Sequence, residues 1–215
     1  MGHDVPRLDA RGLRPPPWEE RDRFGLVNAL VLTIRQVLGS PARLFGSMPV
    51  GLGALQPVLF AAVLALLTSI VDWMWGLSLG GLPAAIAPDL DRLTRGSWFG
   101  GVQLVLGPPL VLAMVFVRAA TFHGVLILLG GSRLGFEATL RVVAYGRATH
   151  VLALLPICGG LVGAVWELVV TVIGLARIHG CEEWKALVAV LAPLVAVAML
   201  WGGGLLALAF LAILP

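Results

Sequence analysis

The chain has 215 residues, of which 59% are apolar and only 13% are charged, and its formal net charge is +3. Soluble domains carry about a quarter charged residues, so this composition excludes an ordinary soluble protein and indicates a surface that faces hydrocarbon. The basic balance does not indicate nucleic-acid binding, because the arginines are scattered between apolar blocks and form no stripe. Arginine outnumbers lysine 14 to 1 amid abundant Ala, Gly and Leu, which is typical of a GC-rich bacterial gene.

The first 48 residues divide into two segments. Residues 1–23 are polar and rich in Pro and Arg, with no apolar core before a signal-peptide cleavage site, so we expect a flexible cytoplasmic tail. In residues 24–48, apolar side chains recur at helical spacing, and Asn28 and Arg35 lie on one side of the predicted helix. This helix is shorter than the ~20 residues that cross a bilayer. We expect it to lie in the inner membrane interface as an amphipathic segment.

Residues 49–215 are expected to form a domain of five transmembrane helices. The predicted spans run over about 52–75, 102–129, 138–155, 160–178 and 186–214. The third span is the least hydrophobic because it contains Arg141, Arg147 and His150. Most Arg and Lys residues fall before the first span or in the loops after the second and fourth, so the positive-inside rule places the N-terminus in the cytoplasm and the C-terminus outside. The predicted fold is an all-α integral membrane protein, with five transmembrane helices preceded by an amphipathic interfacial helix.

Three charged residues lie near the centres of predicted spans: Arg118, Arg147 and Glu167. At ~1.5 Å of rise per residue, each lies ~14–18 Å from one end of its span, so the three are expected at one level. A short turn joins the third and fourth spans, and Glu167 is therefore expected to pair with Arg147, with Arg118 as a competitor or third member. His123 and His150 lie one to two turns from the arginines and complete a candidate intramembrane polar cluster.

Several interpretations of this cluster stay open. It is an ion pair that sets the register of the helices, because intramembrane charges often pair with one another. Alternatively, it lines a polar cavity for an anionic lipid headgroup, an ion or a proton relay, which the excess of two arginines over one glutamate favours. A third interpretation is a wrong span assignment in which Arg147 snorkels to an interface. The histidines either relay protons or donate to backbone carbonyls.

The fourth span also carries a face of small residues. Gly160, Gly163, Thr171 and Gly174 recur at spacings of three and four around Glu167, which is typical of helix packing in membranes.

The two cysteines are predicted on opposite sides of the membrane, which excludes a disulfide and a structural zinc site. The usual metalloprotease, serine-hydrolase and phosphate-loop motifs are missing. We predict no cofactor, no metal and no enzymatic activity.

Two blocks of sequence carry a family resemblance. The first block contains Pro17-Trp18-Glu19, Thr33, Ser40-Pro41, Leu44-Phe45 and Gln56-Pro57. The second contains Ala144-Tyr145-Gly146, Leu154-Leu155-Pro156, Trp166, Ile173-Gly174-Leu175, Ile178-His179-Gly180 and Lys185-Ala186. In order and spacing they resemble the bacterial branch of the Yip family, the Ypt/Rab-interacting membrane proteins, over about residues 17–215.

The resemblance implies an integral membrane domain with a cytosolic N-terminus. Its eukaryotic members are associated with Rab GTPases and vesicle traffic, a role that does not transfer to bacteria, which lack this Rab system. The zinc ribbon that precedes the domain in some bacterial relatives is absent. Arg147 and His150 stand where relatives are mostly apolar, so the charged centre departs from the family pattern.

These observations predict a non-enzymatic, multi-pass inner-membrane protein of Yip type that organises a membrane or a partner complex. Its expected partners are the lipid bilayer, an anionic lipid headgroup, and a second copy or another membrane protein. Nucleic acid is not among them. The alternative is a transporter or lipid-handling protein that uses the mid-membrane polar cluster. A third possibility is a small subunit of a larger membrane complex.

Overall fold

The structure, a computed structural model, describes residues 13–79, 97–156 and 158–213. Within these ranges every regular element is a helix, so the predicted all-helical class is confirmed for the described part. In chain order the elements are η1 (Pro17–Glu20), α1 (Arg21–Phe24), α2 (Leu26–Gly39), α3 (Pro41–Gly46), α4 (Leu55–Leu79), α7 (Ser97–Leu128), α8 (Phe136–Gly146), η2 (Arg147–Leu154), α9 (Gly159–His179) and α10 (Glu183–Ile213).

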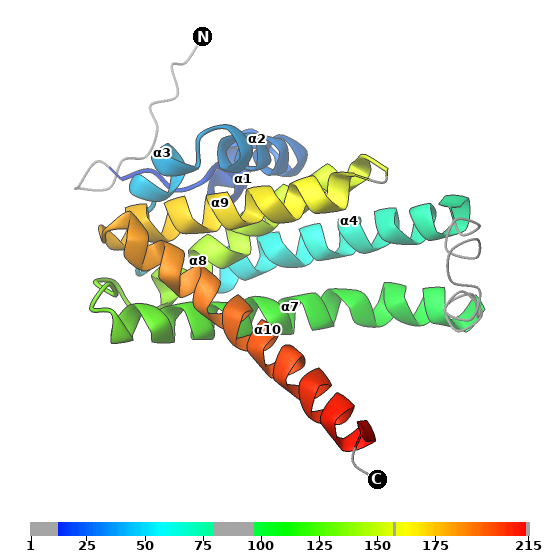
Figure 1. The fold of residues 1–215 in the computed structure, drawn as a ribbon. Helices are drawn as coiled ribbons and strands as arrows, with labels where there is room; N and C mark the ends of the chain where they lie inside the picture. Colours follow the sequence, from blue (N-terminus) through cyan, green and yellow to red (C-terminus); the bar gives the residue numbers. More distant parts are fainter. Residues whose placement is uncertain (1–12, 80–96, 157, 214–215) are drawn as a thin grey trace.

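Three of the described helices are long and apolar enough to cross a membrane. They cover Leu55–Trp75 in α4, Gly101–Leu128 in α7 and Gly159–His179 in α9. Helices α4 and α7 pack side by side, α8 (Phe136–Gly146) joins them to α9, and α10 crosses α7 and α9 obliquely before it leaves the bundle (Figure 1). Large apolar side chains cover their outer surface, including Val105 at 71% and Leu161 at 73% exposure. Such a surface is stable when hydrocarbon covers it, so the chain is a membrane protein.

The expected third and fifth spans differ from these three. The third is not one continuous α-helix, because α8 ends at Gly146 and η2 continues as a 3-10 helix. Residues 138–146 of α8 are all buried, and α8 contacts α4, α7 and α9, so protein encloses it. The expected fifth span corresponds to α10, a helix of 31 residues. The side chains of residues 200 and 202–213 in α10 are outside the described residues.

The expectation of a flexible tail over residues 1–23 is wrong for its final part. Residues 1–12 lie outside the described residues, but η1 and α1 form ordered helical turns from Pro17 to Phe24. The Trp18 side chain is only 3% exposed, and its ring packs edge-on against Phe60 of α4 with centroids 5.6 Å apart. Burial of a large aromatic ring offsets the conformational entropy that a free tail would keep. This segment is therefore part of the folded protein.

The helix expected at the interface, α2, packs onto the flank of the bundle. Ala29, Thr33 and Val37 are fully buried on its inner side, and α2 contacts η1 and η2. At its N-terminal end Leu26 and Val27 are 60% and 70% exposed, and the side opposite the buried one carries the polar Asn28 and Arg35. The next helix, α3, packs against α9 (Figure 1). Residues 17–46 thus form a helical cover along one side of the bundle.

The small-residue face of α9 is largely used inside the chain. A Cβ atom on Gly174 would lie 2.6 Å from Val142 Cγ1 and 3.0 Å from Phe45 Cδ2, so this glycine lets α8 and α3 approach α9. A Cβ atom on Gly163 would lie 3.0 Å from the carbonyl oxygen of Thr149 in η2.

The other two positions of this face differ from each other. Thr171 is buried, whereas Gly160 is exposed with no atom within 4 Å of its ideal Cβ position. The face therefore joins elements of one chain at three of its four positions.

Gly174→Ala should lower the free energy of unfolding by about 1–3 kcal/mol, because the new methyl group forces Val142 or Phe45 out of place. Gly160→Ala on the same helix is the matched control, and we expect it to be neutral or slightly stabilising. Thermal melting of both variants in detergent checks this. Equal melting temperatures for the two variants would contradict the close packing at Gly174.

Candidate functional site

Glu167 lies at the centre of a buried charge network between the spanning helices. Its Oε1 accepts a 2.7 Å hydrogen bond from the guanidinium of Arg118 on α7, and its Oε2 lies 3.0 Å from His150 Nε2 on η2. The Glu167 side chain is 9% exposed, whereas those of Arg118 and His150 are 28% and 29% exposed. The direct partners of Glu167 are therefore Arg118 and His150, and the expected ion pair with Arg147 is absent from the described contacts.

Arg147 reaches this network through His150. Its terminal nitrogen lies 2.7 Å from the same His150 Nε2 atom that approaches Glu167. A ring nitrogen either donates or accepts one hydrogen bond, so Nε2 cannot satisfy the guanidinium and the carboxylate together. The Nε atom of Arg147 is also buried without a partner among the described residues. His150 Nε2 can therefore bond only one of the two at a time: it donates to Glu167 when it carries a hydrogen and accepts from Arg147 when it does not.

Asp72 is a further carboxylate near this network. This aspartate stands on α4, in electrostatic range of both Arg147 and His150. It is exposed, and no described hydrogen bond or ion pair joins it to either residue. The bonded network therefore joins α7, η2 and α9. Asp72 was not among the residues that the sequence predicted for the cluster.

His123, expected in the same cluster, belongs to a separate chain of hydrogen bonds. Its Nδ1 lies 2.9 Å from Thr139 Oγ1, which in turn lies 2.9 Å from His179 Nε2. The backbone N–H of Leu134 donates to His179 Nδ1 at 3.3 Å, so a neutral His179 carries its proton on Nε2 and donates it to Thr139. The Thr139 hydroxyl then donates to His123. These bonds connect α7, α8 and α9 away from Glu167.

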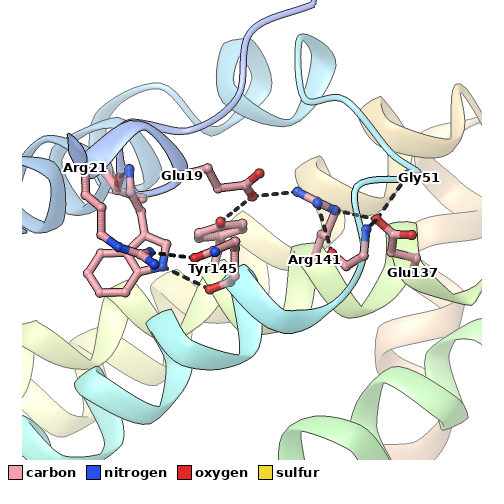
Figure 2. Close-up of polar contacts among 10 residues, drawn as sticks. Glu19, Arg21, Gly51, Glu137, Arg141 and Tyr145 are labelled. Carbon is pink, nitrogen blue, oxygen red and sulfur yellow. Dashed lines mark hydrogen bonds and ion pairs between the residues drawn. The ribbon is translucent and has the colours of Figure 1, made fainter. Parts of the chain in front are cut away.

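A second charge network surrounds Arg141, whose side chain is completely buried. Its guanidinium donates to Glu19 at 2.6 Å, to Glu137 at 3.0 Å and to the carbonyl oxygen of Gly53 at 3.1 Å. The Tyr145 hydroxyl donates to the same oxygen of Glu19 at 2.6 Å. Figure 2 shows Glu19 entering from the N-terminal segment toward Arg141 and Tyr145 on α8. Each of the three guanidinium nitrogens thus donates to an acceptor inside the protein.

Glu137 extends this network to the loop before α4. Its Oε1 accepts the backbone N–H groups of Gly51 and Gly53, both at 3.1 Å. Both glycines have φ of +87°, a conformation that other L residues rarely adopt. The loop therefore presents two N–H groups to one carboxylate oxygen, and they offset part of its negative charge.

Trp18 and Arg21 attach the N-terminal segment at a second place. The indole N–H of Trp18 donates to the carbonyl oxygen of Gln56 at 3.0 Å, and its backbone N–H donates to Thr33 Oγ1 at 2.9 Å. Arg21 donates to the side-chain oxygen of Gln56 at 2.6 Å (Figure 2). The Pro17-Trp18-Glu19 motif is thus an attachment point that joins residues far apart in the sequence.

The geometry agrees with the comparison to known protein families. A model of the Yip1 domain matches residues 35–211. The chain belongs to the Yip1 family. No curated protein and no solved structure matches it. The Yip1 match begins inside α2, so Glu19 and Trp18 precede the matched region and yet bind to its core. Among the described residues no group of three or more His, Cys, Asp or Glu side chains is arranged to hold a metal ion.

Glu19→Gln should lower the free energy of unfolding by about 2–3 kcal/mol, because Arg141 loses a charged partner while it stays buried beside Glu137. Glu20→Gln is the matched control on the next residue, which has no described contact with Arg141. Thermal melting in detergent measures both. A Glu19→Gln protein as stable as Glu20→Gln would contradict the assigned network.

Proposed function

We propose that this Yip1-family chain is a non-enzymatic membrane protein that organises a membrane or a partner complex. We further propose five spans, a bacterial inner membrane, a cytoplasmic N-terminus and a C-terminus on the outside. One observation supports the organising role: each carboxylate oxygen of Glu167 lies within hydrogen-bond distance of a residue of the same chain. A charge that is neutralised internally is suited to holding helices together.

The wider charge balance supports the same proposal. Glu167 finds both of its hydrogen-bond partners within the chain. The Arg141 network likewise finds its partners within the chain. Both networks join elements that are distant in sequence, which is what a rigid platform for other molecules requires.

Three exposed apolar side chains in the N-terminal half of α2 form the proposed contact surface for a partner or a second copy, beside the exposed polar Asn28 and Arg35. Leu26, Val27 and Val31 are 60%, 70% and 46% exposed there. These side chains belong to a helix that η1 holds in place, because Trp18 bonds Thr33 of α2. The surface is therefore both apolar and fixed in position, two properties that favour binding at low entropic cost.

A double-mutant cycle on Arg118 and Glu167 tests the structural role of the central network. Each of Arg118→Gln and Glu167→Gln should lower the free energy of unfolding by about 2–4 kcal/mol, because it leaves one buried charge unpaired. The double variant should recover at least half of that loss, since neither charge remains. Melting temperatures in detergent give the coupling. A double variant whose loss equals the sum of the single losses would contradict the pairing.

Photo-crosslinking in living cells tests the organising role itself. A photoreactive phenylalanine analogue at Val27 on α2 should give a discrete crosslinked band containing this chain and a protein partner or a second copy. The same analogue at Val105 on α7 is the control, because Val105 is equally exposed at 71%. Lipid-only adducts at Val27, or the same protein band from both positions, would contradict a contact surface on α2.

A further inference from the structure

A hollow rich in arginine lies beside the N-terminal segment, apart from both buried networks. Its volume is about 490 Å³, and its polar lining comprises Arg14, Arg23, Arg43, Glu20, Gln36, Ser40 and Ser47. Among the described lining residues three arginines face one glutamate, and because Arg23 has a further interaction of its own, the positive excess rests on the exposed Arg14 and Arg43. A concave site with this excess is complementary to an anion.

The fold builds this hollow from separate segments of the chain. The backbone N–H of Arg14 donates to the carbonyl oxygen of Ser47 at 2.8 Å, which holds the incoming segment against the end of α3. Trp18 anchors the same segment to Thr33 of α2 and to Gln56. Arg14 and Arg43 are exposed, so an incoming anion can reach their guanidinium groups. The site thus exists only where the N-terminal segment is docked.

The rest of the lining is apolar and lies next to the membrane domain. Phe24 and Leu44 contribute to the same hollow, and α3, which carries Arg43 and Leu44, packs against the spanning helix α9. The ring of Phe45 on α3 contacts α9 at Gly174. Arginine binds phosphate oxygens through its planar guanidinium, while apolar side chains suit the glycerol and acyl parts of a lipid.

We infer that this arginine hollow binds the phosphate group of an anionic phospholipid from the leaflet on its side of the membrane. A soluble phosphate shares the headgroup chemistry, but it would leave the apolar lining of Phe24 and Leu44 without a partner. The inference depends on membrane embedding of the protein. It does not depend on the proposed organising role, which the crosslinking experiment tests separately.

Native mass spectrometry of the full chain in detergent tests the site with phosphatidylglycerol and phosphatidylcholine as probes. The unsubstituted chain should retain phosphatidylglycerol preferentially. The Arg14→Gln/Arg43→Gln variant should bind it about 25-fold more weakly, because each arginine near a membrane surface contributes about fivefold in affinity. Arg35→Gln is the matched control, because Arg35 is exposed on α2 and does not line the hollow. It should bind like the unsubstituted chain.

Glu20→Gln provides a test in the opposite direction that does not depend on losing an arginine. Removing the only acidic side chain among the described lining residues should raise phosphatidylglycerol retention severalfold. Equal retention of the two lipids by the unsubstituted chain would overturn the inference. So would an equal loss with Arg35→Gln, which would indicate diffuse surface charge. Inorganic phosphate that displaces the lipid at low millimolar concentration would overturn the lipid as the ligand.

Discussion

A charged side chain inside an apolar bundle must be neutralised by the protein itself, and Arg141 is the clearest instance in this chain. Its side chain has no exposed surface, and an isolated buried guanidinium would cost several kcal/mol. The protein surrounds it with Glu19, Glu137 and the carbonyl oxygen of Gly53. These partners come from the N-terminal segment, from α8 itself and from the loop before α4, so one charge determines where three parts of the chain meet.

The same constraint organises the centre of the membrane domain. Glu167 on α9 is bonded by Arg118 of α7 and His150 of η2, and Arg147 lies within hydrogen-bond distance of the same His150. The two networks lie on different parts of the bundle and are connected along the chain, because η2 directly continues α8. The Yip1 match covers the central network and Arg141, whereas Glu19 precedes it. In this chain a segment before the matched region therefore contributes a buried ion-pair partner to the domain.

Much of the helical organisation follows from local sequence, and the pairing of charges does not. Long apolar runs predict α4, α7 and α9 because length and hydropathy are local properties. The rise of the helix predicts Arg118, Arg147 and Glu167 at one depth. The short turn between the third and fourth spans then predicts Arg147 as the first partner of Glu167. The structure gives Arg118 and His150, because η2 is a 3-10 helix with a different side-chain rotation from the continuous α-helix that was assumed.

The contact between Glu19 and Arg141 spans 122 positions and has no local signature. Composition alone makes residues 1–23 look like a polar tail, and polarity cannot distinguish a free glutamate from one that neutralises a buried arginine. The signal was the Pro17-Trp18-Glu19 motif, since a tryptophan next to a polyproline stretch is unusual in a free tail.

Hydrogen exchange at the backbone N–H of Trp18 tests most directly whether the N-terminal segment is part of the folded domain. This N–H donates to the buried Thr33 Oγ1, so it can exchange only when the segment detaches. In the full chain, reconstituted in lipid nanodiscs, we predict that it exchanges as slowly as the buried amides of α8 and that Glu19→Gln accelerates it. Exchange at the rate of an unstructured peptide in the unsubstituted protein would contradict the account.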